Sequence, residues 1–144
     1  MTTLMTNLMY QTWTTRKLTV PEAVPSVLVA DDYSSAAEAL ASFLALEGVD
    51  ARVALGGNEA LLAVQHWLPA VIILDIQMPG RDGISTASQL RSNPATAAVG
   101  IVAFTSLEGR EVSQRASPGD FDGYCQKGVS PALLLGLLRA LWSA

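Results

Sequence analysis

Five short apolar segments recur along the chain, and each is followed by a stretch whose pattern favours a helix. The apolar segments cover residues 27–30, 51–55, 71–74, 100–104 and 123–126, and helices are expected over 35–47, 58–67, 83–92, 107–116 and 131–142. Strands that alternate with helices form parallel sheets, because each helix carries the chain back to start the next strand. The sequence therefore predicts an α/β fold with a doubly wound, five-stranded parallel sheet.

The third apolar segment carries the most informative motif. Residues 71–74 are four consecutive large apolar residues, typical of a strand that is buried on both faces. Asp75 follows directly, the run Met78-Pro79-Gly80 favours a turn, and Asp82 is expected to cap the next helix. The Asp75 carboxylate is therefore predicted to lie at the tip of a buried strand.

Polar residues also end three of the other predicted strands. They are Asp31 and Asp32 after the first strand, Thr105 after the fourth and Lys127 after the fifth. In a flavodoxin-like sheet of strand order 2-1-3-4-5, the first and third strands are neighbours and all carboxyl ends share one edge. We therefore expect Asp31, Asp32 and Asp75 to meet in one cleft at that edge.

Three crowded carboxylates favour a bound cation. Two unit charges about 4 Å apart repel by about 4 kcal/mol at an effective dielectric constant near 20. Oxygen ligands are those that Mg²⁺ prefers, and Mg²⁺ can also neutralise a phosphoryl oxygen. Asp75 is then the natural nucleophile, and it would form an aspartyl phosphate. Lys127 can pair with one phosphoryl oxygen, and the hydroxyl of Thr105 can donate to another.

These motifs resemble the receiver domains of two-component response regulators, the CheY-like domains, over residues 26–142. The resemblance implies that Asp75 is the phosphoacceptor. It also implies that Asp32, Asp75 and the main-chain carbonyl of Gln77 bind Mg²⁺ directly, with Asp31 acting through water. Lys127 would stabilise the phosphoryl group.

The same resemblance implies a switch pair, Thr105 and Tyr124. On phosphorylation the Thr105 hydroxyl would move toward the phosphoryl group, and the Tyr124 ring would turn inward. The face around the last two strands and helices would then change shape for a partner.

Composition narrows the partners and the compartment. The net charge is −4 and only nine lysines and arginines are present, scattered along the chain, which argues against a nucleic-acid surface. No segment approaches the roughly 18 uncharged apolar residues of a membrane helix. Cys125 is the single cysteine, and the amino terminus lacks a signal-peptide pattern, so we expect a cytoplasmic protein.

The two ends of the chain lead to separate expectations. Residues 1–25 show neither helical nor strand periodicity and are predicted to be a flexible N-terminal extension, with the receiver domain at 26–144. Only two residues follow Trp142, so a stand-alone receiver is expected. The last helix is apolar nearly all round, which favours a homodimer or a downstream protein docked on it.

The functional prediction is therefore a signalling domain. It would accept a phosphoryl group from a sensor histidine kinase or a histidine phosphotransfer protein, and it would act on partners by contact. It would not be an enzyme beyond phosphorylating itself from small donors and dephosphorylating itself. Two alternatives stay open: a degenerate receiver that only docks, and a Mg²⁺-dependent phosphohydrolase with an aspartyl nucleophile. The hydrolase normally needs an acid two residues after the nucleophile, where Gln77 stands here.

Overall fold

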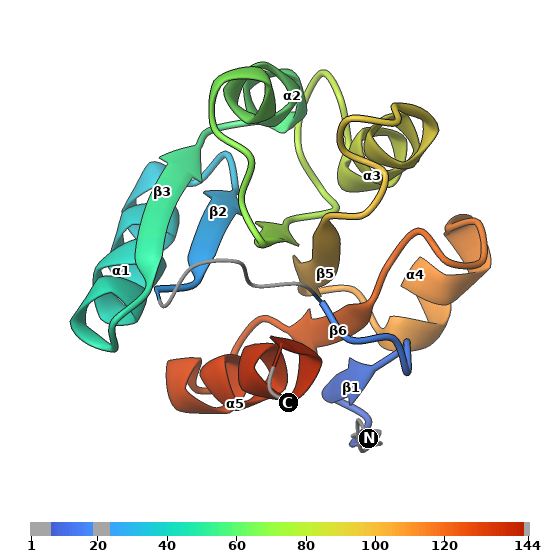
Figure 1. Cartoon of the computed structure of the whole chain (residues 1–144). Coiled ribbons are helices and arrows are strands. Elements are labelled where there is room, and N and C mark those ends of the chain that lie inside the picture. The colour runs from blue at the N-terminus through green and yellow to red at the C-terminus, as the bar shows by residue number, and fades with distance from the viewer. Residues whose placement is uncertain (1–6, 19–23, 143–144) are drawn as a thin grey trace.

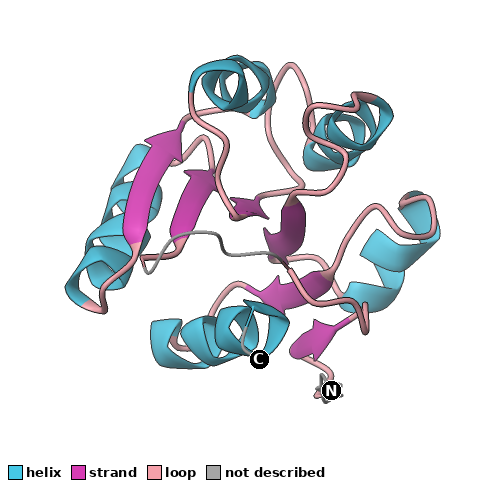
Figure 2. Cartoon of the chain, viewed as in Figure 1, coloured by secondary structure: helices cyan, strands magenta, loops and turns pink. Residues whose placement is uncertain are grey.

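The computed structural model describes residues 7–18 and 24–142, which form a six-stranded sheet between two layers of helices (Figure 1). The strands are β1 (Tyr10–Thr12), β2 (Ser26–Ala30), β3 (Asp50–Ala54), β4 (Val71–Leu74), β5 (Gly100–Thr105) and β6 (Gly123–Gln126). The helices are α1 (Ser34–Leu46), α2 (Gly57–His66), α3 (Gly83–Ser92), α4 (Gly109–Arg115) and α5 (Pro131–Trp142). Figure 2 shows how the strands and helices alternate along the chain.

The parallel part of the sheet confirms the predicted fold class. The strand order is β1-β6-β5-β4-β2-β3, and the neighbours from β3 to β6 pair in parallel. When β1 is set aside, this is the predicted order 2-1-3-4-5. The doubly wound, flavodoxin-like architecture is thus present in full.

The sixth strand is a correction to the sequence prediction. Strand β1 pairs antiparallel with β6, with Tyr10 opposite Cys125 and Thr12 opposite Gly123. The sequence predicts a flexible extension over residues 1–25 with no strand periodicity, and the strand at Tyr10–Thr12 corrects that prediction for these three residues. A three-residue strand is too short to show a periodic pattern; it forms because β6 would otherwise be an edge with unpaired backbone groups. Residues 1–6 and 19–23 of the predicted extension lie outside the described residues.

The alternation of side chains along the parallel strands creates two cores, one on each face of the sheet. One core contains Val27, Val29, Val71, Ile73 and Val102, and it is closed by apolar residues of α1 and α5. The other contains Leu28, Ala30, Ile72, Leu74, Ile101 and Ala103, and it is closed by residues of α2, α3 and α4. All four residues of β4 are buried, as expected for a strand covered on both sides.

The apolar surface of α5 is largely covered within the chain itself. Its buried residues are Leu134, Leu135, Leu137, Leu138 and Leu141. Leu18 lies in the same core, and its amide nitrogen donates to the carbonyl oxygen of Leu141 at 3.1 Å. Of the α5 leucines, Leu133 is the exposed one, with 44% of its surface accessible. The apolar character that suggested a docking face therefore has an intramolecular explanation for most of this helix.

The predicted cap of α3 is confirmed, and α4 is shorter than the predicted range of 107–116. The Asp82 carboxylate caps α3, because its Oδ1 accepts from the amide of Ser85 at 2.8 Å. Helix α4 is only seven residues long and ends at Arg115, before the turn at Pro118 and Gly119. Within the described ranges, none of the helices combines the length and the apolarity needed to span a membrane.

Candidate functional site

The register of two neighbouring strands brings the predicted acidic residues together. Ala30 of β2 lies opposite Leu74 of β4, so the residues that follow, Asp31 and Asp75, leave the sheet side by side. The amide of Asp75 donates to the carbonyl of Ala30 at 2.9 Å, which continues the ladder to the strand tip. Asp32 is the next residue along the loop.

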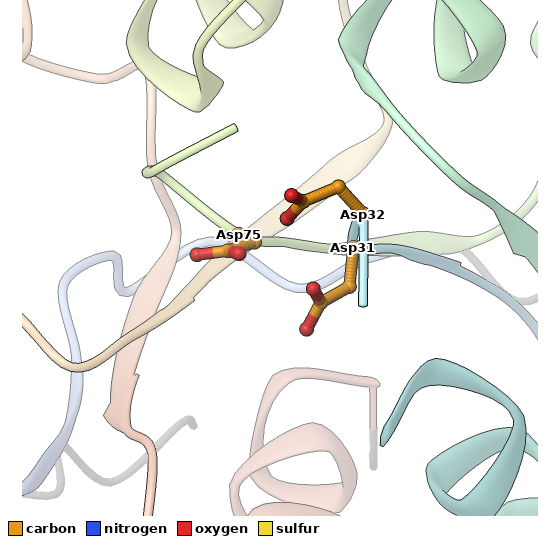
Figure 3. A group of neighbouring side chains, drawn as sticks. All are labelled: Asp31, Asp32 and Asp75. Carbon is orange, nitrogen blue, oxygen red and sulfur yellow. The ribbon is translucent and has the colours of Figure 1, made fainter. Parts of the chain in front are cut away.

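One carboxylate oxygen from each of Asp31, Asp32 and Asp75 lies within 4.8 Å of the others. Figure 3 shows the three side chains grouped at the ends of the two strands. Asp31 and Asp75 are almost fully buried, with 2% and 4% of their surfaces exposed, whereas Asp32 faces solvent. The cluster is therefore closed on the side of the sheet and open on one side to solvent.

Lys127 reaches this cluster from the loop after β6. Its Nζ lies 2.9 Å from Oδ2 of Asp31 and 3.2 Å from Oδ2 of Asp75. The lysine side chain keeps 31% of its surface exposed, so it closes the site without sealing it. The residue after it is Gly128, which has a φ of +102°, a backbone conformation that favours glycine.

The charges of the site perturb its titrating groups. Burial raises the pKa of Asp75 above its ordinary 3.8; Lys127 opposes this shift and the negative charge of Asp31 adds to it. Burial by itself lowers the pKa of Lys127, but hydrogen bonds and attraction from Asp31 and Asp75 outweigh it, so that this pKa is raised. One ammonium group thus faces three carboxylates, and the site has an excess of negative charge.

Thr105 and Tyr124 lie on the two strands beside this cluster. Thr105 ends β5 and is fully buried, and its Oγ1 accepts from the amide of Leu107 at 3.3 Å. Tyr124 is also fully buried, and its hydroxyl donates to the carbonyl of Leu107 at 2.7 Å. The two residues of the predicted switch pair are therefore linked through the backbone of Leu107.

Gln77 lies in the loop after β4, at the mouth of the site. Its amide nitrogen donates to Oδ1 of Asp75 at 3.3 Å, and its side-chain Oε1 accepts from the hydroxyl of Ser106 at 3.2 Å. The side chain therefore spans the loops that follow β4 and β5. The expected role of its main-chain carbonyl as a metal ligand stays a prediction.

The donor set fits a hard divalent cation. Three carboxylates converge, every candidate ligand atom is oxygen, and the open side leaves room for water ligands, all of which Mg²⁺ prefers. The raised pKa of Asp75 reports in part the repulsion that such a cation would relieve. The residues present therefore suit the metal that the sequence predicts.

The structure brings Asp31, Asp32, Asp75 and Lys127 together at this edge, and it places Thr105 at the end of the neighbouring strand β5. Sequence reasoning missed the contact of Trp13 with Tyr124, whose ring centroids lie 5.5 Å apart with the planes at 5°. No local signal could have revealed it, because the two residues lie far apart in the chain and meet only when β1 joins the sheet.

The sequence matches the family described as the response regulator receiver domain over residues 27–139. The chain therefore belongs to the response regulator receiver domain family, whose members are phosphoaccepting modules of two-component systems. The match begins at β2, so that β1 and the residues up to Leu18 lie before it.

Curated relatives and solved structures agree with this assignment. The chain is 29% identical over 115 residues to the response regulator PleD of Caulobacter vibrioides, covering 80% of this chain and 25% of PleD. It is 32% identical over 114 residues to the DNA-binding response regulator MtrA of Mycolicibacterium paratuberculosis, covering 79% of this chain and 49% of MtrA. The chain thus spans about a quarter to a half of the length of these relatives.

The solved structures are closer in size. The chemotaxis protein CheY4 of Vibrio cholerae superposes with a TM-score of 0.77 at 27% identity, covering 83% of this chain and 99% of that chain. The receiver domain of the Francisella response regulator 1452 gives a TM-score of 0.70 at 30% identity, covering 81% and 93%.

Proposed function

We propose that Asp75 accepts a phosphoryl group from a histidine kinase or a histidine phosphotransfer protein, and that the phosphorylated chain signals by protein contact. The observation that carries this proposal is the position of Asp75. Its buried carboxylate lies beside two further carboxylates and within 3.2 Å of the ammonium group of Lys127. A carboxylate nucleophile between a cation-binding cluster and a fixed positive charge is suited to phosphoryl transfer.

In the proposed transfer, one carboxylate oxygen of Asp75 forms a bond to phosphorus while the phosphorus–nitrogen bond of a phosphohistidine breaks. The electron pair of that bond stays on the imidazole nitrogen, which then takes up a proton. Lys127 moves its charge from the free carboxylate to a phosphoryl oxygen, and the Thr105 hydroxyl donates to another. These residues stabilise the added negative charge where it develops.

Asp31, Asp32 and Asp75, with the main-chain carbonyl of Gln77, would hold Mg²⁺, which supplies neutralisation of the phosphoryl oxygens when bound. Asp31 orients Lys127 through the 2.9 Å contact between its Oδ2 and Nζ. The loop that carries Asp31 is itself held, because Oδ1 of Asp31 accepts from the amide of Tyr33 at 3.0 Å. These contacts fix the lysine before a donor arrives.

Phosphorylation is proposed to be read out on the face formed by α4, β6 and α5. The Thr105 and Tyr124 hydroxyls are both hydrogen-bonded to the backbone of Leu107, so that a displacement of one would displace the other. The stand-alone character expected from the sequence stays a prediction, and the activities of the longer relatives are not part of this proposal.

The proposal is tested by intact-mass analysis after incubation with Mg²⁺ and a small phosphoryl donor such as acetyl phosphate. The parent protein should gain the mass of one phosphoryl group, and Asp75→Ala should gain none. Asp82→Ala is the matched control, because it removes a solvent-accessible carboxylate from the same loop without touching the cluster.

Each other outcome selects a different function. No adduct on the parent protein, or an adduct that survives Asp75→Ala, would remove Asp75 from its role and favour the docking module. Steady turnover of a generic phosphomonoester, lost in Asp75→Ala, would instead favour the phosphohydrolase. A stable or slowly hydrolysing adduct without such turnover supports the receiver.

A further inference from the structure

The segment of residues 9–18, here called the N-terminal strap, lies along β6 and α5. Besides the pairing of β1 with β6, the amide of Trp13 donates to the carbonyl of Asp122 at 2.7 Å, and the amide of Gln126 donates to Met9 at 2.6 Å. The strap precedes the residues that match the receiver family. It is therefore an addition to the face on which the proposed signal is read out.

Three side chains of the strap are seated in specific positions. The ring of Trp13 stacks on Tyr124, the guanidinium of Arg16 binds Asp122 at 2.7 Å, and Leu18 enters the core. The domain leaves room for the Leu18 side chain at Gly100, because a Cβ at that position would overlap it. This degree of fit indicates a built contact with the folded domain.

Tyr124 is held inward by contacts on two sides. On one side its hydroxyl donates to the carbonyl of Leu107 at 2.7 Å, and on the other the indole of Trp13 lies parallel to its ring. Trp13 is itself fixed by its backbone bond to Asp122 and by a 2.6 Å hydrogen bond from Nε1 to the side chain of Gln11. An outward turn of Tyr124 would break the hydrogen bond to Leu107 and the stack together.

We propose that Trp13 is a positioning residue for the switch, which holds Tyr124 inward and thereby couples the strap to phosphorylation of Asp75. The inference rests on the proposed function of Asp75. The contacts run without a gap from Trp13 to Tyr124, from Tyr124 to the carbonyl of Leu107, and from the amide of Leu107 to the hydroxyl of Thr105.

Thermodynamic linkage between the strap and phosphorylation predicts the direction in which each affects the other. If phosphorylation favours the inward Tyr124, as the resemblance to receiver domains implies, then the strap and the phosphoryl group stabilise the same conformation. Each must then strengthen the other by the same factor. A stacked aromatic pair contributes enough to change such an equilibrium by about two- to tenfold. Loss of Trp13 should lower the phosphorylated fraction, and phosphorylation should tighten the strap.

The first experiment follows Tyr124 directly, by fluorine NMR of protein labelled with 3-fluorotyrosine. The chain has three tyrosines, and Tyr124→Phe assigns the resonance. Trp13→Ala should shift or broaden the Tyr124 signal in the absence of any donor, whereas Trp13→Phe, which keeps an aromatic ring, should restore most of it. Trp67→Ala is the matched control, because Trp67 lies against Arg52 of β3, at the opposite edge of the sheet from β1 and β6.

The second experiment measures the coupling. With acetyl phosphate and Mg²⁺, the steady-state ratio of phosphorylated to unphosphorylated protein should be about two- to tenfold lower for Trp13→Ala than for the parent. Trp13→Phe should recover most of it and Trp67→Ala should match the parent. Hydrogen exchange of the Gln126 amide, which is bonded to the strap, should slow by a similar factor on phosphorylation.

An unchanged Tyr124 signal in Trp13→Ala would overturn the positioning role. Normal adduct formation in Trp13→Ala, together with no change in exchange at Gln126, would overturn the coupling while leaving the proposed function of Asp75 intact. Absence of an adduct on the parent protein would refute the proposed function instead, and with it the coupling. The donor-free fluorine spectra would still decide whether Trp13 positions Tyr124.

Discussion

Buried carboxylates occur at both ends of the parallel strands, and their surroundings differ. At the carboxyl edge, Asp31 and Asp75 share one partner, Lys127, which they approach within 2.9 and 3.2 Å. At the amino edge, Asp122 precedes β6 and binds two guanidinium groups, those of Arg16 at 2.7 Å and Arg91 at 2.9 Å. At the carboxyl edge two buried carboxylates share one ammonium group, whereas at the amino edge Asp122 alone has two guanidinium partners.

The amino-edge cluster satisfies its carboxylate within the protein. Besides the two arginines, Oδ2 of Asp122 accepts from the amide of Ile101 at 2.9 Å, and the side chain is only 2% exposed. Burial lowers the pKa of Arg91, and the charge of Asp122 opposes that shift. These donors neutralise and hydrogen-bond the Asp122 carboxylate, so that it does not require a bound cation. The cluster therefore joins the strap, α3, β5 and β6 structurally.

The carboxyl-edge cluster has more carboxylates than positive charges, which suits the cation-binding role proposed for it. The excess of carboxylates raises the electrostatic energy of the folded state, and a cation and a phosphoryl group together would relieve it. The comparison teaches that burial of an acidic residue does not by itself mark a functional site. The balance of charge around the residue is the better guide, and at the carboxyl edge it supports the proposed site.

The largest expected effect is a loss of stability when the Asp122 cluster at the amino edge is disrupted. Asp122→Ala leaves two guanidinium groups and the Ile101 amide without their shared acceptor, so the free energy of unfolding should fall by about 3–5 kcal/mol. Urea denaturation measures this. Asp50→Ala is the control, because that carboxylate is 49% exposed and lies 3.8 Å from Arg52, and it should cost less than about 0.5 kcal/mol. Equal losses in both variants would show that the Asp122 cluster is no more than a surface ion pair.

A smaller change in stability is expected when Mg²⁺ binds the acidic cluster at the carboxyl edge. At a concentration one hundred times its dissociation constant, the ion should raise the free energy of unfolding by about 2.7 kcal/mol. Asp32→Asn should weaken this response, and Asp50→Asn, at the other edge, should leave it unchanged. Denaturation curves across a Mg²⁺ series at fixed ionic strength provide the measurement. A response that is the same in the parent and in Asp32→Asn would place the ion elsewhere.

The smallest expected effect is a gain of stability from Asp75→Asn without divalent cations. The pKa of Asp75 is raised on folding, so the ionised carboxylate destabilises the folded protein at every pH above that pKa. The gain should therefore be present at neutral pH, about 1 kcal/mol or less because the site is partly open to solvent. It should shrink as the pH falls through the folded pKa and disappear below 3.8, where the carboxylate is protonated in both states.

Denaturation of the parent and of Asp75→Asn between about pH 3 and pH 7 tests this prediction. The same pair of measurements in Mg²⁺ should reverse the order of stability, because the ion stabilises only the protein that binds it well. A variant that is less stable than the parent at pH 7 without metal would mean that the pairing of Asp75 with Lys127 outweighs the burial of its charge.

The local sequence determined the parallel sheet and the composition of the site. Runs such as 71–74 are apolar enough to require burial on both faces, and the residue after each run must then lie at the edge of the sheet. The positions of Asp31, Asp75, Thr105 and Lys127 follow from strand order alone, so they could be predicted from a sequence pattern. The cap at Asp82 is equally local.

Tertiary structure alone decided what happens around β6. Nothing in the sequence near Tyr10–Thr12 indicates a strand, because its pairing energy comes from an edge more than one hundred residues away. The stack of Trp13 on Tyr124 and the bond of Arg16 to Asp122 depend on that pairing. The apolar faces of α5 are read from the sequence, but which segment covers them is not. Burial is non-directional, and only the folded chain shows that Leu18 takes that place.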